Sequence, residues 1–324
     1  MNGILATMNL DVKKVLVTGG NGFVGTNLCN RLDELSVDYF APSSEDYDLT
    51  SENDVKKLFT EYQPNIVLHL AGKVGGIGAN KEKPGDFFYD NIMMGTLVME
   101  YSKRFNVEKV VALAAGCGYP KHLEVPYAES DFWKDLPDEN SIGYSMAKKN
   151  LIIQSWTYRE QFNFNSTILL PANLYGPHDN FNLKTSHVVP ALIRKFIEAN
   201  ENGDESVVVW GSGVASREFL YVDDTVDAII DAIDCKESGP FNLGTGKETT
   251  IKQLVESISK LINFKGKIIW DTTKPDGQPK RFYDMSEFKR AFSYVPSTDL
   301  EEGLKKTIKW YQNEMYHYID YYYD

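Results

Sequence analysis

The first third of the chain alternates between short apolar runs and segments with apolar residues at helical spacing. The run VLVT at residues 15–18 predicts a strand, and residues 23–32 predict a helix directly after it. Residues 37–42 and 65–72 predict two further strands. The segment SENDVKKLFTEY at 51–62, which opens with a serine typical of a helix cap, predicts a helix between them. This alternation predicts a Rossmann fold, a doubly wound α/β sheet of parallel strands.

The later sequence indicates a second, smaller lobe. At 324 residues the chain exceeds the usual size of a single core. Residues 223–234 predict a helix, and residues 241–246 predict a strand; both return to the sheet, so the two lobes interleave along the chain. We therefore expect a nucleotide-binding Rossmann domain at 13–180 plus about 218–246, and an α+β substrate lobe at 181–217 and 247–324.

Composition narrows the classes of partner. The 46 acidic and 34 basic residues give a net charge of -12, which argues against nucleic acid as a partner. No apolar run reaches the roughly 18 residues of a membrane span, and the N-terminus lacks the basic and apolar regions of a signal peptide. The three cysteines are widely spaced, which favours free thiols over a disulfide framework or a metal site. We expect a cytoplasmic protein without a metal ion.

A glycine-rich turn joins the first predicted strand to the first predicted helix. Gly19 and Gly20 permit a tight turn, Gly22 allows the backbone to approach a pyrophosphate, and Gly25 allows the helix to pack close to the strand. The N-terminus of the helix then offers free N–H groups to the phosphates. This order of strand, turn and helix predicts a dinucleotide site.

The segment APSSEDYD, after the second predicted strand, bears on the choice between NAD and NADP. NAD enzymes place an acidic residue near the end of this strand, where it binds the ribose 2′-hydroxyl. Here Ser43 and Ser44 offer hydroxyl groups to a 2′-phosphate, but Glu45 and Asp46 are near and no arginine is. These residues leave the choice of cofactor open.

Tyr144 and Lys148 lie four residues apart in a predicted helix, and hence on one face of it. In such a pair the ammonium favours the phenolate, and the phenol donates its proton as a substrate carbonyl becomes an alkoxide. The same spacing is also common on exposed helices, where it has no catalytic role. The position of this pair downstream of the glycine turn favours proton transfer.

Several sequence blocks resemble one family. The blocks are the glycine turn, HLAGKVGGIGAN at 69–80, YDNIMMGT at 89–96, the Tyr144 and Lys148 pair, PANLYGPHDNF at 171–181, SHVVPALIRKF at 186–196, WGSGVASREFLYVDD at 210–224, FNLGTG at 241–246 and KPDGQPKR at 274–281. Together they resemble the GDP-L-fucose synthases, a branch of the extended short-chain dehydrogenase/reductases. The resemblance implies a homodimer that uses NADP(H) as the 3,5-epimerase and 4-reductase of GDP-4-keto-6-deoxy-D-mannose.

The resemblance implies roles for four side chains. Tyr144 would hold the enolate oxygen and later protonate O4, and Lys148 would also bind the nicotinamide ribose. The epimerising cysteine of the family falls on Cys117, and its partner histidine falls on His187. Inversion at C3 and C5 requires two such groups, one on each face of the sugar. Without the resemblance, a small buried cysteine after a strand is more often a packing residue.

The resemblance also implies further contacts with cofactor and substrate. Expected cofactor contacts are Gly19, Gly22, Phe23, Val24, Gly25, Ser43, Ser44, Asp48, Leu49, Leu70, Ala71, Lys148, Pro171, Asn173, Leu174 and His187. Expected substrate contacts are Lys195, Trp210, Arg217, Lys280 and Arg281. Arg217 matches the pyrophosphate arginine of the family, whereas Lys195 stands where arginine is usual, which loses a bidentate contact but keeps the charge. Lys195 and Lys280 are equally compatible with solvated surface lysines.

One departure from the family lies in the segment ALAAGCGYP at 112–120. Short-chain reductases carry a serine or threonine there, whose hydroxyl binds the substrate carbonyl beside the tyrosine. In this chain the position is Ala115, and the next, where a second serine is common, is Gly116. Loss of one oxyanion donor typically costs about 10²-fold in rate or more. A slower enzyme, a hydroxyl recruited from elsewhere, and a shifted substrate such as a GDP-4-keto-heptose all remain open.

We therefore expect epimerisation at C3 and C5 and NADPH-dependent reduction at C4 to give GDP-L-fucose, with NAD(H) as an open alternative to NADP(H). The alternatives are an enzyme that only reduces or only epimerises a related GDP-4-keto sugar, and a catalytically silent nucleotide-binding module. Cys117 and His187 argue against a pure reductase, and Ala115 argues against efficient reduction. Tyr144 and Lys148 argue against the silent module.

Overall fold

The computed structural model describes residues 13–315; residues 1–12 and the tyrosine-rich segment 316–324 lie outside the described part. Its centre is a sheet of six parallel strands in the order β2-β1-β3-β4-β5-β10. The strands are β1 (Val15–Thr18), β2 (Tyr39–Phe40), β3 (Ile66–His69), β4 (Lys109–Leu113), β5 (Ser166–Pro171) and β10 (Phe241–Leu243). The predicted Rossmann fold is confirmed.

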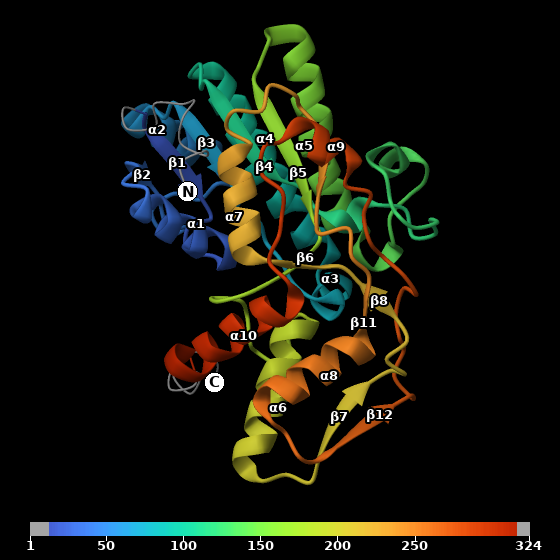
Figure 1. Ribbon diagram of the computed structural model, residues 1–324. Helices are drawn as coiled ribbons and strands as arrows, with labels where there is room; N and C mark the ends of the chain where they lie inside the picture. The colour runs from blue at the N-terminus through green and yellow to red at the C-terminus, as the bar shows by residue number, and fades with distance from the viewer. Residues whose placement is uncertain (1–12, 316–324) are drawn as a thin grey trace.

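Helices cover the sheet on both faces (Figure 1). α1 (Phe23–Glu34) packs against α7 (Val222–Asp231), and α4 (Pro84–Arg104) packs against α5 (Ile142–Phe162) and α2 (Glu52–Tyr62). Strands β1, β3 and β4 are buried along their whole length, as a sheet covered on both faces requires. No helix in the described part combines the length and the apolar character that crossing a membrane requires.

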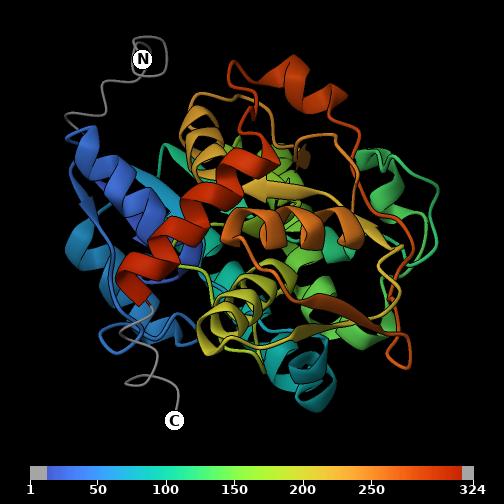
Figure 2. The ribbon, with the colours of Figure 1, turned by 60° about the horizontal axis from the view of Figure 1, so that its bottom comes forward.

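A smaller lobe lies below the sheet in Figure 1 and contains three helices with three pairs of short strands. The helices are α6 (Val188–Asn202), α8 (Ile251–Ile262) and α10 (Leu300–Trp310). The pairs are β7 (Ser206–Trp210) with β12 (Lys267–Asp271), β6 (Asn173–Tyr175) with β9 (Phe219–Tyr221), and β8 (Ser216–Arg217) with β11 (Thr249–Thr250). Figure 2 shows α8 and α10 side by side, and the two helices are in contact.

Short elements complete the described chain. They are α3 (Ile77–Glu82), α9 (Ser286–Ala291), the 3₁₀ turns Gly116–Gly118, Glu129–Trp133 and Glu139–Ser141, and a π turn at Tyr311–Met315. The predicted helix cap is present, because the hydroxyl of Ser51 accepts a hydrogen bond from the backbone N–H of Asp54 at 3.4 Å. The first turn of α2 therefore begins where the sequence predicts it.

Two groups of buried apolar side chains form the cores of the two lobes. The strand predicted at 241–246 does return to the sheet, where β10 pairs with β5. The segment that contains Tyr283, Phe288 and Phe292 packs into the core around the sheet, although the predicted boundary places residues 247–324 in the smaller lobe. This segment therefore passes beside the carboxyl ends of the strands, where ligands bind in open α/β sheets.

Candidate active site

The glycine turn after β1 has the geometry of a dinucleotide cradle. Gly19 has a φ of +76°, and a Cβ at this position would lie 2.7 Å from the backbone nitrogen of Ala71. A Cβ on Gly25 would lie 2.0 Å from the carbonyl oxygen of Gly19, so only glycine lets α1 approach so closely. Gly22 caps α1 without a side-chain hydrogen bond, which leaves N–H groups of the first turn for an anion.

The end of β2 lacks the carboxylate that NAD sites place there. Ala41 and Pro42 follow the strand directly. The hydroxyl of Ser43 donates to Asp46 at 2.6 Å, which fixes this turn, and Ser44 is exposed to solvent. Ser44 is therefore free to meet a ribose substituent, although the Asp46 carboxylate lies close to it in sequence.

α5 places Tyr144 and Lys148 on one face, as predicted. The ammonium of Lys148 donates to the backbone oxygens of Ala71 at 3.4 Å and Leu113 at 3.3 Å, which links the loops after β3 and β4. Burial lowers the pKa of Lys148 to about 8. Burial, and then the nearby Cys117, raise the pKa of Tyr144. Tyr144 is therefore a protonated phenol at neutral pH, in a state to donate a proton.

Cys117 lies beside this pair, in the 3₁₀ turn that follows β4. The hydroxyl of Ser145 donates to the Cys117 carbonyl oxygen at 3.1 Å and to its Sγ at 3.2 Å. Burial raises the pKa of the Cys117 thiol, while Arg281, Ser145 and Lys148 act in the opposite direction. Cys117, Tyr144, Ser145 and Lys148 form what we call the candidate catalytic cluster, or the cluster for short.

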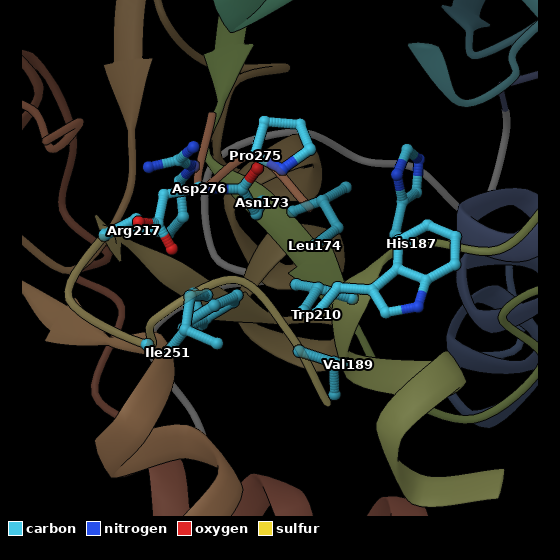
Figure 3. Close-up of a pocket in the computed structure, with 13 residues that line it drawn as sticks. Asn173, Leu174, His187, Val189, Trp210, Arg217, Ile251, Pro275 and Asp276 are labelled. Atoms are coloured by element: carbon cyan, nitrogen blue, oxygen red, sulfur yellow. The ribbon is translucent and has the colours of Figure 1, made fainter. Parts of the chain in front are cut away.

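A pocket of about 310 Å³ lies beside the cluster, between β6, the N-terminus of α6 and the strands of the smaller lobe. Figure 3 shows Arg217 on one side of it and His187 and Trp210 on the other. Asn173 and Leu174, which the sequence predicts as cofactor contacts, also line the pocket. Burial lowers the pKa of His187. Cys117 and Tyr144 are not among the described residues that line this pocket, so His187 and the cluster do not share it.

Trp210 offers an exposed aromatic face to this pocket. Its side chain is 65% exposed, and the ammonium groups of Lys195 and Lys274 each lie 5.5 Å from its ring centroid. These distances are within the range of a cation–π interaction. From the sequence, Lys195 is compatible with either a substrate contact or a solvated surface lysine. In the structure it lies beside Trp210, which lines the pocket.

Of the two predicted substrate contacts Arg217 and Lys280, only Arg217 lines the pocket. The Arg217 guanidinium donates to the backbone oxygens of Ser216 and Gln278, each at 2.6 Å, and lines the pocket. Burial, and then Arg281, lower the pKa of Arg217. Lys280 instead forms an ion pair with Glu248 at 3.3 Å and is not among the described residues that line the pocket. Its predicted contact with substrate stays a prediction.

Arg281, which the sequence predicts as a substrate contact, lies next to the cluster. One of its terminal nitrogens is 2.7 Å from the position that a Cβ on Gly116 would take, next to Cys117. The guanidinium also hydrogen-bonds the hydroxyl of Tyr283. Arg217 and Arg281 therefore form a positively charged path from the pocket to the cluster.

Sequence reasoning missed Glu218 and Ser145. Glu218 is buried and accepts hydrogen bonds from the backbone N–H groups of Thr245, Gly246 and Tyr283, the last at 2.8 Å. It thereby joins the loop after β10 to the segment that carries Arg281. A buried acidic residue inside the block WGSGVASREFLYVDD was the available signal for Glu218, and adjacency to Tyr144 was the signal for Ser145.

Residues 15–244 match the model of the NAD dependent epimerase/dehydratase family. The chain belongs to this family. It is 39% identical to putative GDP-L-fucose synthase 2 of Arabidopsis thaliana, over 92% of this chain and 91% of that protein. The resemblance predicted from the sequence blocks is thereby confirmed.

Solved structures of family members have the same fold. The GDP-L-fucose synthetase of Naegleria fowleri bound to NADP is 30% identical with a TM-score of 0.85, over 93% of this chain and 93% of that one. The GDP-D-glycero-L-gluco-heptose synthase of Campylobacter jejuni, in the presence of NADPH, is 25% identical with a TM-score of 0.88, over 94% of this chain and 99% of that one. Both likenesses extend over almost the whole chain, including the smaller lobe.

Proposed function

We propose that this protein is an NADP(H)-dependent enzyme that epimerises GDP-4-keto-6-deoxy-D-mannose at C3 and C5 and reduces it at C4 to give GDP-L-fucose. The observation that carries the proposal is the hydrogen bond from Ser145 to the sulfur of Cys117, directly beside Tyr144 and Lys148. Reduction alone needs a proton donor and a hydride, whereas epimerisation also needs a group that removes protons from carbon. The relatives named GDP-L-fucose synthase support this substrate.

The glycine turn and α5 fit a nicotinamide dinucleotide. Gly19, Gly22 and Gly25 leave the space and N–H groups that a pyrophosphate requires. Lys148 keeps one N–H beyond its bonds to Ala71 and Leu113, and this N–H would bind a ribose hydroxyl. When bound, the nicotinamide would supply a hydride to C4. The lack of a carboxylate at the end of β2 and the NADP bound by the Naegleria fowleri protein favour NADP(H).

The cluster and His187 divide the proton transfers between them. Cys117 removes protons beside the ketone in its thiolate form; burial raises the pKa of the thiol, and Arg281, Ser145 and Lys148 offset part of that effect. His187 returns protons from the opposite face; burial lowers its pKa, so the neutral imidazole takes up a proton and the imidazolium then releases it readily. Tyr144 binds O4 throughout and protonates it at the end, since its raised pKa keeps the phenol neutral until an alkoxide forms.

The pocket accepts the nucleotide part of the substrate. A GDP-sugar carries two phosphate charges, and Arg217 lies in the pocket with donors in the fork geometry that phosphate prefers. The exposed ring of Trp210, flanked by Lys195 and Lys274, provides a stacking surface for the base. In this arrangement the sugar lies between His187, at the edge of the pocket, and the cluster that contains Cys117 and Tyr144.

A second candidate is reduction of a GDP-4-keto-heptose. Ala115 stands where short-chain reductases usually carry a hydroxyl, and this change in the site favours a substrate other than the usual one. The high structural likeness to the Campylobacter jejuni heptose synthase also supports it.

Oxidation of NADPH with each purified GDP-4-keto sugar separates these candidates. We expect consumption of NADPH with GDP-4-keto-6-deoxy-D-mannose, formation of GDP-L-fucose, and a loss of about 10²-fold or more in Tyr144→Phe. Turnover of the heptose alone would select the second candidate. No turnover of either sugar by protein that binds NADPH would indicate the silent module.

We also propose a homodimer in a reducing, cytoplasmic environment. α4 and α5 expose the apolar side chains of Phe88, Tyr89, Met146, Ile153 and Trp156, and such faces on a folded protein usually meet a partner. All three cysteines are free, as thiols are in a reducing compartment. Sedimentation equilibrium should give twice the chain mass for the wild type and the chain mass for Ile153→Glu. A monomeric wild type would contradict the proposed dimer.

A further inference from the structure

The space beside the backbone of Gly116 is filled by another part of the chain. A Cβ at this position would lie 1.7 Å from the hydroxyl oxygen of Tyr283 and 2.7 Å from a terminal nitrogen of Arg281. No side chain fits at residue 116 unless Tyr283 moves. The hydroxyl of Tyr283 and the guanidinium of Arg281 therefore reach the end of β4. The side chains of the chain itself at 115 and 116 supply no hydrogen-bond donor there.

The fold holds Tyr283 firmly in this position. Its side chain is only 3% exposed, and its backbone N–H donates to Glu218 at 2.8 Å. A parallel bridge joins it to Tyr127, and the ring of Tyr119 lies 5.6 Å from its own ring centroid. These contacts come from Glu218 and from the segment 119–127 that follows β4, so the surrounding fold fixes the position of the hydroxyl.

The hydroxyl of Tyr283 can donate its hydrogen bond to a bound ligand instead of to its present partner. It accepts a hydrogen bond from Arg281 and donates to the backbone oxygen of Pro171 at 3.4 Å. Hydroxyl hydrogen bonds are usually near 2.8 Å, so a better acceptor displaces this long bond at low cost. Burial raises the pKa of Tyr283 despite Arg281, so the phenol keeps its proton at neutral pH and acts as a donor.

Tyr283 and Tyr144 both lie near Cys117. Ser145, the residue after Tyr144, donates a hydrogen bond to the sulfur of Cys117 at 3.2 Å, and a negative charge on that sulfur raises the pKa of both phenols. Gly116, which Tyr283 touches, is also the neighbour of Cys117 in the chain. For a sugar placed with C3 or C5 at Cys117, both hydroxyl groups are therefore candidate donors to the C4 oxygen.

We infer that Tyr283 is a further catalytic residue, whose hydroxyl donates a hydrogen bond to the C4 oxygen of the sugar in place of the side-chain hydroxyl that residues 115 and 116 lack. The inference rests on the proposed function. Tyr283 forms and breaks no covalent bond: Tyr144 would supply the proton to O4, and bound NADPH would supply the hydride to C4. The second donor stabilises the negative charge that develops on O4 in both the enolate and the alkoxide.

Tyr283→Phe tests this role, because it keeps the ring and removes only the oxygen. We expect kcat for NADPH oxidation with GDP-4-keto-6-deoxy-D-mannose to fall by about 10²-fold, the usual loss for one oxyanion donor, with KM nearly unchanged. Tyr175→Phe is the matched control in the smaller lobe. Its hydroxyl is also buried, donates to the backbone oxygen of Leu300 at 3.5 Å, and lies 2.1 Å from a Cβ position on Gly303. This variant should keep the wild-type kcat.

Rescue distinguishes catalysis from packing. Adding Ala115→Ser to Tyr283→Phe restores a hydroxyl at the end of β4 and should recover about tenfold or more of the lost kcat. A wild-type kcat in Tyr283→Phe would overturn the inference and leave the proposed function intact. A loss in Tyr283→Phe that Tyr175→Phe shares and that Ala115→Ser does not reverse would assign Tyr283 to packing. A wild type that turns over no GDP-4-keto-6-deoxy-D-mannose would overturn the proposed function together with the inference.

Discussion

Ser145→Ala should weaken proton removal by Cys117 more than any other step. The Ser145 hydroxyl is the side-chain donor hydrogen-bonded to the sulfur of Cys117, at 3.2 Å, and it also binds the carbonyl oxygen of the same residue at 3.1 Å. The neighbouring Tyr144 and Lys148 keep their positions on α5, because alanine suits a helix interior. The perturbation therefore acts on the thiolate rather than on the fold.

The size of the effect follows from the loss of one hydrogen bond to a charged group. Such a bond contributes about 1.5 kcal/mol, which corresponds to about one pKa unit. Burial already raises the pKa of Cys117 and Ser145 opposes this, so removal of the hydroxyl raises the pKa further. At neutral pH the thiolate fraction, and with it the rate of proton removal, should fall about tenfold.

Exchange of the C3 and C5 hydrogens with D₂O, measured by ¹H NMR without NADPH between about pD 6 and 9, isolates this step. The rate profile of Ser145→Ala should move toward higher pD by about one unit. Ser102→Ala is the control, since Ser102 is buried and its hydroxyl has no hydrogen-bond partner within the described part of the chain. An unmoved profile in Ser145→Ala, or an equal shift in Ser102→Ala, would refute the reasoning.

Two further predictions concern the cofactor and stability. Gly25→Ala places a Cβ 2.0 Å from the Gly19 oxygen, so α1 must move by about 1 Å at a cost of about 1–3 kcal/mol. Fluorescence titration should show that this variant binds NADPH at least about tenfold more weakly than the wild type. The control Gly85→Ala, which has no atom near its Cβ position, should bind NADPH normally. Burial raises the pKa of Asp179, one of whose oxygens has no partner among the described residues, to about 7. Its folded pKa exceeds the unfolded value near 4, so its ionisation destabilises the folded protein increasingly from about pH 4 to 7. Asp179→Asn should therefore raise the midpoint of thermal unfolding at pH 8, with much less gain at pH 5, and an equal shift at both would contradict this assignment.

The sequence alone was enough to predict the features that depend on a few neighbouring residues. Gly19 and Gly25 were predicted as the glycines of a dinucleotide turn, and their crowded Cβ positions bear out the need for glycine. Ser51 was predicted to open a helix, and it caps α2. The four-residue spacing of Tyr144 and Lys148 places them on one face of α5. All of these features depend only on short-range geometry, which the sequence determines directly.

Contacts between distant segments were beyond such reasoning. Tyr283 reaches Gly116 across more than 160 residues of sequence, and nothing in the block KPDGQPKR indicates that the chain turns there toward β4. For the same reason the predicted domain boundary assigned this segment to the smaller lobe, whereas it packs with the sheet. Arg281 was grouped with phosphate ligands by its charge, and only the fold reveals its position beside Cys117.

The most direct test of the whole account is a ¹H NMR time course with GDP-4-keto-6-deoxy-D-mannose in D₂O, run first without and then with NADPH. We predict that deuterium enters C3 and C5 before any NADPH is added, and that GDP-L-fucose forms once it is present. Reduction at C4 without exchange at C3 and C5 would contradict the role of Cys117 and His187. Exchange without reduction would contradict the claim that Tyr144 and the cofactor site complete the reaction.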